Sequence, residues 1–332
     1  MVTIHPRDGM KTLGTALTTA STIPTDSPRA FTLAHLSDPH LTSLVGVHPG
    51  DLANKRILGY LSWRRRRRRV HRIETLAEVV ADMRAFAPDH VVVTGDLTHV
   101  GLPEECATAA AWLRDLGPAD RVSLVPGNHD RYVAADFDRT VGLWRDYFRG
   151  DDGAIGFPFV RRRGRVALIG VDTAVPTPPF LASGRIGDAQ RTRLEGVLEQ
   201  TRAAGLFRVV LLHHSPLADG HSRRKRLSDA AQLTQTLMTR GAELVIHGHG
   251  HEERIDRLQG PAGPMLVVAV PSASYDAPGR AGWNQYRISG EAGAWRLDLE
   301  ARRSSVGGYV TTTRETVSWG ETVSRAVAPT SR

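Results

Sequence analysis

The chain has 332 residues, of which 41% are hydrophobic, and its formal net charge is +8. That length supports one substantial core, and no hydrophobic run is long enough to span a bilayer. The single cysteine, Cys106, excludes an intramolecular disulfide and a cysteine-based metal cluster, and it fits a reducing compartment. The basic charge favours an anionic partner, which could be a phosphorylated substrate, nucleic acid or an acidic lipid surface.

Residues 1–30 carry threonines and prolines and predict a flexible N-terminal lead-in. Beyond them, short apolar runs alternate with segments of helical periodicity. We expect strands at 31–37, 90–94, 122–125, 166–171, 209–212 and 244–246, and helices at 75–86, 104–116, 188–203 and 229–239. Three more strands, at 265–270, 284–289 and 295–299, follow without helices between them. The alternation predicts an α/β architecture, and the late strands predict a second, partly antiparallel sheet.

The motifs that we expect to carry chemistry extend from Asp38 to His251, so a single domain must hold them together. We place this catalytic domain at residues 31–300. The remaining residues, 301–332, are rich in threonine, serine and arginine and predict a peripheral C-terminal tail.

Five polar clusters come directly after predicted strands. Ligand sites in α/β sheets gather at the carboxyl ends of strands, so these clusters should converge on one place. Glycines within them would allow tight turns where a Cβ atom could clash. The clusters are Asp38-Pro39-His40, Gly95-Asp96, Gly127-Asn128-His129-Asp130, His213-His214 and Gly248-His249-Gly250-His251.

Imidazole and carboxylate side chains without thiolates predict transition metals such as manganese, iron or zinc. An aspartate can bridge two ions, and Asn128 offers a neutral oxygen. Two divalent ions, the charges of Asp38 and Asp96, and one hydroxide leave a net charge of about +1. Such a site favours a phosphoryl group.

The order of the motifs, D-x-H, G-D, G-N-H-D, H and G-H-x-H, resembles the calcineurin-like metallophosphoesterases over residues 31–275. The resemblance implies a four-layer α/β/β/α sandwich with two mixed sheets and two divalent or mixed-valence metal ions at the strand ends. It implies that His129 assists the leaving group and that Asp130 orients His129. The implied ligands are Asp38, His40, Asp96 and His251 for one metal, and the bridging Asp96 with Asn128, His213 and His249 for the other.

The family hydrolyses phosphate esters with a metal-activated hydroxide. The histidine doublet and the compact single domain resemble the bacterial cyclic-nucleotide phosphodiesterase branch, so we expect a phosphodiester substrate. Three alternatives stay open: a lipid-nucleotide hydrolase of the UDP-diacylglucosamine type, a phosphomonoesterase, and a non-catalytic scaffold. No ligand position is degraded, which speaks against the scaffold.

Several histidines lie outside this ligand set. The family pattern favours His213 over His214 as a ligand and leaves His214 as a substrate contact. We expect His247 to support a metal ligand through a hydrogen bond and His35 to lie in the core. His99 could face the site or solvent, and His221 lies in a basic loop. We expect Cys106 to be a small buried residue.

The segment Arg56–Arg72 combines apolar and aromatic residues with the run Arg64–Arg69. Apolar residues beside a basic cluster predict an amphipathic helix on an anionic membrane, with Trp63 at the headgroup boundary. This would place a cytoplasmic enzyme at the periphery of the inner membrane. Nucleic acid is the less favoured partner for such a run, and a solvated loop is the remaining interpretation.

Overall fold

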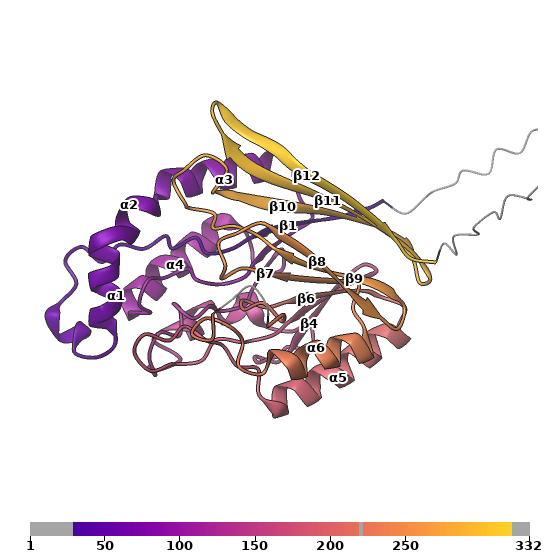
Figure 1. Cartoon of the computed structure of the whole chain (residues 1–332), viewed down its shortest axis with the longest axis horizontal. Helices are drawn as coiled ribbons and strands as arrows, with labels where there is room; N and C mark the ends of the chain where they lie inside the picture. Colours follow the sequence, from indigo (N-terminus) through magenta and orange to yellow (C-terminus); the bar gives the residue numbers. More distant parts are fainter. Residues whose placement is uncertain (1–28, 219–221, 321–332) are drawn as a thin grey trace, which may run out of the picture.

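The computed structural model describes residues 29–218 and 222–320 and shows two six-stranded sheets stacked between helices (Figure 1). The predicted lead-in, except for residues 29 and 30, lies outside the described residues. Within the described ranges, no helix has both the length and the apolar character needed to cross a membrane.

The first sheet has the strand order β12-β11-β10-β1-β2-β3. Its short central strands are parallel to one another and fully or nearly fully buried, as expected for runs of valine and leucine. The later strands are antiparallel hairpins. The strands are β1 Phe31–Leu36, β2 His90–Val93, β3 Val122–Leu124, β10 Gly282–Glu291, β11 Ala294–Ser305 and β12 Gly308–Ser318.

The second sheet has the strand order β4-β5-β6-β7-β9-β8. Its four inner strands are parallel, and its two edge strands pair antiparallel with their neighbours. The strands are β4 Phe159–Arg163, β5 Val166–Gly170, β6 Phe207–Leu211, β7 Leu244–His247, β8 Arg254–Gly260 and β9 Gly263–Ala269.

Helices cover the outer faces of both sheets. Helices α3 (Ile73–Ala85) and α4 (Pro103–Leu116) are the crossovers between the parallel strands of the first sheet. Helices α5 (Asp188–Ala203) and α6 (Ala230–Arg240) cover the second sheet (Figure 1). The inner faces of the two sheets share one apolar core. The predicted α/β/β/α sandwich with two mixed sheets is confirmed.

The residue-300 boundary of the expected domain falls inside β11. Residues 301–318 continue the first sheet, and Val317 and Trp319 join its core. The composition that suggested a tail is that of an edge strand, because threonine favours β-strands and suits a strand whose side chains stay mostly exposed or half-exposed. The edge strands β4 and β8 were also not expected.

The segment 49–70 is helical and lies at one end of the molecule (Figure 1). A 3-10 turn, Pro49–Leu52, precedes helix α1 (Arg56–Ser62), and a π-helical turn (Trp63–Arg67) connects α1 to the short α2 (Arg68–Val70). Trp63 is only 5% exposed and packs with Leu44, Val100 and Leu102. The prediction that Trp63 stands at a headgroup boundary is therefore wrong, because its side chain packs against the protein itself, although Ile57 of the same helical segment is 42% exposed.

Candidate metal centre

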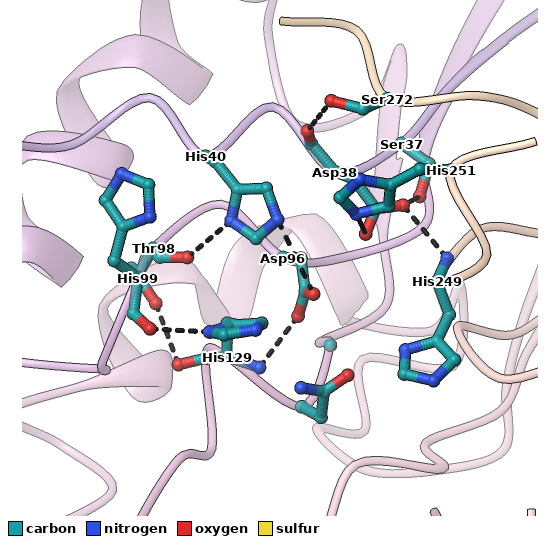
Figure 2. A network of polar contacts seen from close by, with 12 residues as sticks. Ser37, Asp38, His40, Asp96, Thr98, His99, His129, His249, His251 and Ser272 are labelled. Atoms are coloured by element: carbon teal, nitrogen blue, oxygen red, sulfur yellow. Dashed lines mark hydrogen bonds and ion pairs between the residues drawn. The ribbon is translucent and has the colours of Figure 1, made fainter. Parts of the chain in front are cut away.

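The strand-end loops bring predicted ligands together, and Figure 2 shows Asp38, His40, Asp96, His249 and His251 close to one another. Asp38, His40 and His251 offer ligand atoms that lie within 4.8 Å of one another. A second group of this kind consists of Asp38, Asp96 and His213, and a third consists of His213, His214 and His249. Adjacent groups share a residue, so the ligands form one continuous cluster.

Asp38 is held so that one of its carboxylate oxygens faces the cluster. Its Oδ2 accepts hydrogen bonds from the Ser37 hydroxyl at 2.7 Å and from the backbone N–H of His249 at 3.0 Å. Its Oδ1 lies 3.0 Å from Nε2 of His251. The fold therefore uses one oxygen for support and directs the other to a second predicted ligand.

Asp96 lies between the two predicted ligand sets. Its Oδ1 accepts from the backbone N–H of His129 at 2.7 Å. Its Oδ2 lies 3.9 Å from Nε2 of His40 and 3.5 Å from Nε2 of His213. Because His40 and His213 belong to different predicted sets, this position suits a carboxylate that bridges two ions.

His40 and His213 are oriented by backbone carbonyls. Nδ1 of His40 lies 3.0 Å from the Thr98 carbonyl oxygen, and Nδ1 of His213 lies 2.6 Å from that of Thr94. A carbonyl can only accept, so Nδ1 carries the proton and Nε2 faces the carboxylates. Metal-binding histidines are usually fixed in this manner.

The remaining predicted ligands lie on the other side of Asp96. Oδ1 of Asn128 is 3.2 Å from Nε2 of His213. The His249 ring centroid is 5.1 Å from that of His213, and its Nε2 lies 2.8 Å from the Lys225 carbonyl oxygen. These three residues are the partners that the resemblance assigned with Asp96 to one metal.

The backbone is strained at the ligand positions. Asp38, His40, Asp96, His249 and His251 all have positive φ angles, between 39° and 65°. Side chains other than glycine rarely adopt this conformation, which costs about 1–3 kcal/mol per residue. Such strain persists only where the surroundings enforce it, and it is concentrated at functional sites.

Two glycines allow the loops to approach one another. A Cβ atom at Gly127 would collide with the Asp96 side chain, and one at Gly248 would collide with Ser37 and Asp38. The expected clash is confirmed at both positions. Substituting either residue would displace a carboxylate of the cluster.

The carboxylates and imidazoles of the cluster interact strongly and shift one another's pKa values. Burial acts to lower the pKa of His213, but Asp96 and Asp38 outweigh it and raise the pKa to about 10. Burial acts to raise the pKa of Asp38, but His251 and His213 hold it well below its usual value. Buried carboxylate oxygens and imidazole nitrogens that converge in this way form a donor set that fits a dinuclear metal site.

Asp130 does not contact the ring of His129, so its predicted orienting role is wrong. Its carboxylate accepts from the backbone N–H groups of Asp96, Gly127 and Thr98, at 2.8–3.0 Å. Instead, Nδ1 of His129 lies 2.5 Å from the carbonyl oxygen of His99 (Figure 2). Asp130 therefore holds the two ligand loops against each other, and His99 orients His129 through its backbone.

The other histidines have varied surroundings. His35 is buried and bonded to Thr94, as expected for the core. His99 is buried and its ring stacks on His40 with centroids 5.3 Å apart. His247 is buried with Nδ1 3.2 Å from the Gly248 carbonyl oxygen. His214 contacts Thr173 and the Ala182 carbonyl. His221 lies outside the described residues, and Cys106 is buried as expected.

A cavity of about 340 Å³, here called the histidine cavity, opens on the cluster. His71 and Arg67 are among the lining residues to which sequence reasoning gave no role at the site. The His71 ring centroid lies 4.5 Å from that of His40, and burial, followed by the charges of His251 and His99, lowers the pKa of His71 to about 2. Trp63, Arg67 and His71 are spaced four residues apart, and this helical period was the available signal.

A second cavity of about 510 Å³, here called the α1 cavity, adjoins the first. The two cavities share Arg66, Arg67, Asn128 and His129 among their lining residues. The α1 cavity is otherwise more apolar, with walls that include Leu58, Leu61, Tyr132, Phe180 and Leu181.

Two solved structures have a similar fold. A dimetal phosphatase from Danio rerio superposes with a TM-score of 0.55 at 12% identity, over 85% of this chain and 98% of that one. A purple acid phosphatase from yellow lupin seeds superposes with a TM-score of 0.52 at 15% identity, over 88% of this chain and 55% of that one. These identities establish the fold alone. No curated protein sequence matches the chain.

The sequence model of calcineurin-like phosphoesterases matches residues 31–253, which contain every strand-end cluster described above. The match covers more than half of the chain and agrees with the two-sheet fold and the His/Asp clusters. The chain therefore belongs to the calcineurin-like phosphoesterase family.

Proposed function

We propose that the chain hydrolyses phosphodiesters, using two divalent or mixed-valence ions of manganese, iron or zinc. The observation that carries this proposal is the pair of cavities that meet at Asn128 and His129. A diester has two substituents on phosphorus, whereas a monoester has one. A phosphoryl group beside the ligand cluster would leave a cavity for each substituent.

The walls of the α1 cavity suit a planar substituent such as a nucleobase. The Tyr132 ring stacks near that of His129 at a centroid distance of 5.5 Å, and Phe180 is 75% exposed. Exposed aromatic faces bind planar groups by stacking. This supports a nucleotide-like diester, including the cyclic-nucleotide type suggested by the histidine doublet.

The ligands named above would hold the two ions. When bound, the metals would supply an acidified water as nucleophile and stabilise charge on the phosphoryl oxygens. His99 fixes Nδ1 of His129, so Nε2 is the ring atom through which His129 can exchange a proton with the leaving group. Asp130 keeps the loops of Asp96 and Asn128 in register.

The test compares kcat/KM of manganese-loaded protein for bis-nitrophenyl phosphate and nitrophenyl phosphate. We expect the diester to be preferred by at least about tenfold, or ~1.4 kcal/mol. Chelated protein is the control and should be inactive on both. A clear preference for the monoester would replace the proposed substrate class, and cyclic nucleotides and nucleotide-lipids are the natural diesters to test next.

A lipid-linked diester of the UDP-diacylglucosamine type is the second candidate. The α1 cavity is bordered by Arg65 and Arg66, which are exposed, as are Arg64, Arg68 and Arg69. With Trp63 buried, attraction to an anionic membrane would rest mainly on these arginines, beside the exposed side chains of Ile57 and Phe180. Such an attraction would bring a lipid headgroup to the mouth of the α1 cavity.

A further inference from the structure

The six arginines of the run Arg64–Arg69 are identical in sequence, but the fold places one of them differently. Arg67 is half-buried and lines both the histidine cavity and the α1 cavity. The other five are exposed. Three of these, Arg64, Arg68 and Arg69, line neither cavity.

The helical period explains this difference. Gly59, Trp63, Arg67 and His71 follow one another at intervals of four and lie on one face of the segment. A Cβ atom at Gly59 would collide with Val100, so this face is in close contact with the protein. The π-helical turn Trp63–Arg67 is wider than an α-helical turn and offsets the drift of a four-residue spacing. Arg67 is thereby carried toward the metal ligands.

Arg67 has no ion-pair partner among the described residues, although Asp96 lines the same cavity. Its Nη1 lies 2.8 Å from Nε2 and 2.9 Å from Nδ1 of His129. No carboxylate of the described residues lies within ion-pair distance of its guanidinium. Nδ1 of His129 already faces the His99 carbonyl, so Nε2 is the acceptor for Arg67. A partly desolvated guanidinium with only a neutral ring as partner is satisfied further by an anion.

The walls of the α1 cavity also carry positive charge without nearby negative charge. The α1 cavity is lined by Lys55 and three arginines and by no carboxylate. The ammonium of Lys55 donates to Thr177 Oγ1 at 2.6 Å and to the Leu181 carbonyl at 2.9 Å, so it holds the wall of the cavity. Arg66 and Arg67 both line the two cavities, but Arg66 is exposed, whereas Arg67 is half-buried and lies within hydrogen-bond distance of His129.

We propose that Arg67 binds the substrate, donating from its guanidinium to a non-bridging phosphoryl oxygen beside His129. This inference rests on the proposed phosphoesterase function. The planar guanidinium presents two parallel N–H groups that match two phosphoryl oxygens. In this assignment one arginine of the run serves the active site, and its exposed neighbours are available to other partners.

The test measures binding of inorganic phosphate to manganese-loaded protein by calorimetry. We expect Arg67→Gln to weaken binding about 10-fold to 100-fold, as for the loss of a charged hydrogen bond. Arg67→Lys retains the charge but loses the two parallel N–H groups of the guanidinium. Its phosphate affinity should therefore lie between those of Arg67→Gln and the wild type. Arg64→Gln removes an equal charge from the same run and should change binding less than about twofold.

Metal content and thermal unfolding of each variant accompany the binding data. If Arg67→Gln does not fold, Arg67→Lys decides, with weakened binding at unchanged metal content as the expected result. Wild-type affinity in the Arg67 variants, equal weakening by Arg64→Gln, or no phosphate binding by the wild type overturns the proposal. Arg67-dependent phosphate binding without hydrolysis of any phosphoester would retain the Arg67 assignment and reject the proposed function.

Discussion

The strand-end loops and the helical segment 56–72 both contribute polar side chains to the same site, but they position them differently. In the loops, each proposed ligand lies in a polar cluster directly after a strand, five of the seven have a backbone at positive φ, and backbone groups of other loops orient several of the side chains, as the Thr98 carbonyl does for His40. In the helical segment, position depends on which face packs against the protein. Arg67 differs from Arg66 only in its angle around the helix axis.

This contrast teaches where residue patterns are informative. A spacing such as G-H-x-H specifies a local turn that presents two histidines, so metal binding can be inferred from the sequence motif. A run of identical residues specifies only charge, and the packing of the surrounding helix selects the functional member. The following experiments test this distinction, from the largest expected effect to the smallest.

The largest effect is expected for Asp96→Asn. Because Oδ2 of Asp96 lies near ligands from both sets, this change should impair both metal sites. We expect kcat/KM to fall by more than about 10³-fold and bound metal to fall from two equivalents toward one or none. Elemental analysis and diester hydrolysis measure this. Asp89→Asn, at the opposite end of β2, is the control. Active protein with two metals after Asp96→Asn would reject the bridging role.

His129→Ala should retain both metals but turn over slowly. His129 lies beside the ligands without belonging to either set. Because Nδ1 faces the His99 carbonyl, Nε2, which contacts Arg67 in this structure, is the ring nitrogen that would meet a leaving group once the Arg67 guanidinium binds the phosphoryl group. We expect a loss of about 10²–10³-fold for diesters with alkoxide leaving groups and a much smaller loss for nitrophenolate, which needs little protonation. Parallel kinetics on both substrate types decide this, and an equal loss on both would remove His129 from this role.

Glu105→Gln tests the support of the loop that orients His129. The buried carboxylate of Glu105 accepts from the backbone N–H groups of His99, Val100 and Leu102 and from the Thr42 hydroxyl, at 2.6–3.1 Å. An amide has only one accepting oxygen, so we expect the free energy of unfolding to fall by about 2–3 kcal/mol.

Chemical denaturation measures this change in stability. The matched control is Glu104→Gln, because Glu104 is adjacent in sequence and exposed. Its stability should stay within about 0.5 kcal/mol of the wild type. Equal effects of the two substitutions would mean that the hydrogen bonds of Glu105 contribute no stability.

The smallest effect on hydrolysis is expected from replacing Arg64, Arg68 and Arg69 together by serine. These exposed residues line neither cavity, so turnover of a soluble diester should change less than about threefold. Binding to anionic vesicles at low salt should weaken, since each basic residue contributes about 1 kcal/mol near such a surface. Co-sedimentation with anionic and neutral vesicles measures this. Wild-type protein that ignores anionic vesicles would exclude the membrane partner.

The sequence by itself determined the fold class and most of the proposed ligands that meet at the candidate metal centre. A buried strand of valine and leucine ends where the sequence changes from apolar to polar residues. The polar residues that follow parallel strands gather at one sheet edge. The seven proposed ligands lie together for this reason. The strand β12 was missed because an edge strand needs few apolar residues, so its composition resembles that of a solvated tail.

The tertiary structure alone decided how the supporting residues are used. Asp130 was expected at the His129 ring, but a carboxylate takes the donors that the fold presents, and these are backbone N–H groups of two loops. From sequence alone, Trp63 could face a membrane. In the folded chain it packs against Val100 and Leu102, which belong to a different segment. Arg67 points into the site because Trp63, one helical turn earlier, is buried. Such roles depend on contacts between distant segments, which local spacing does not encode.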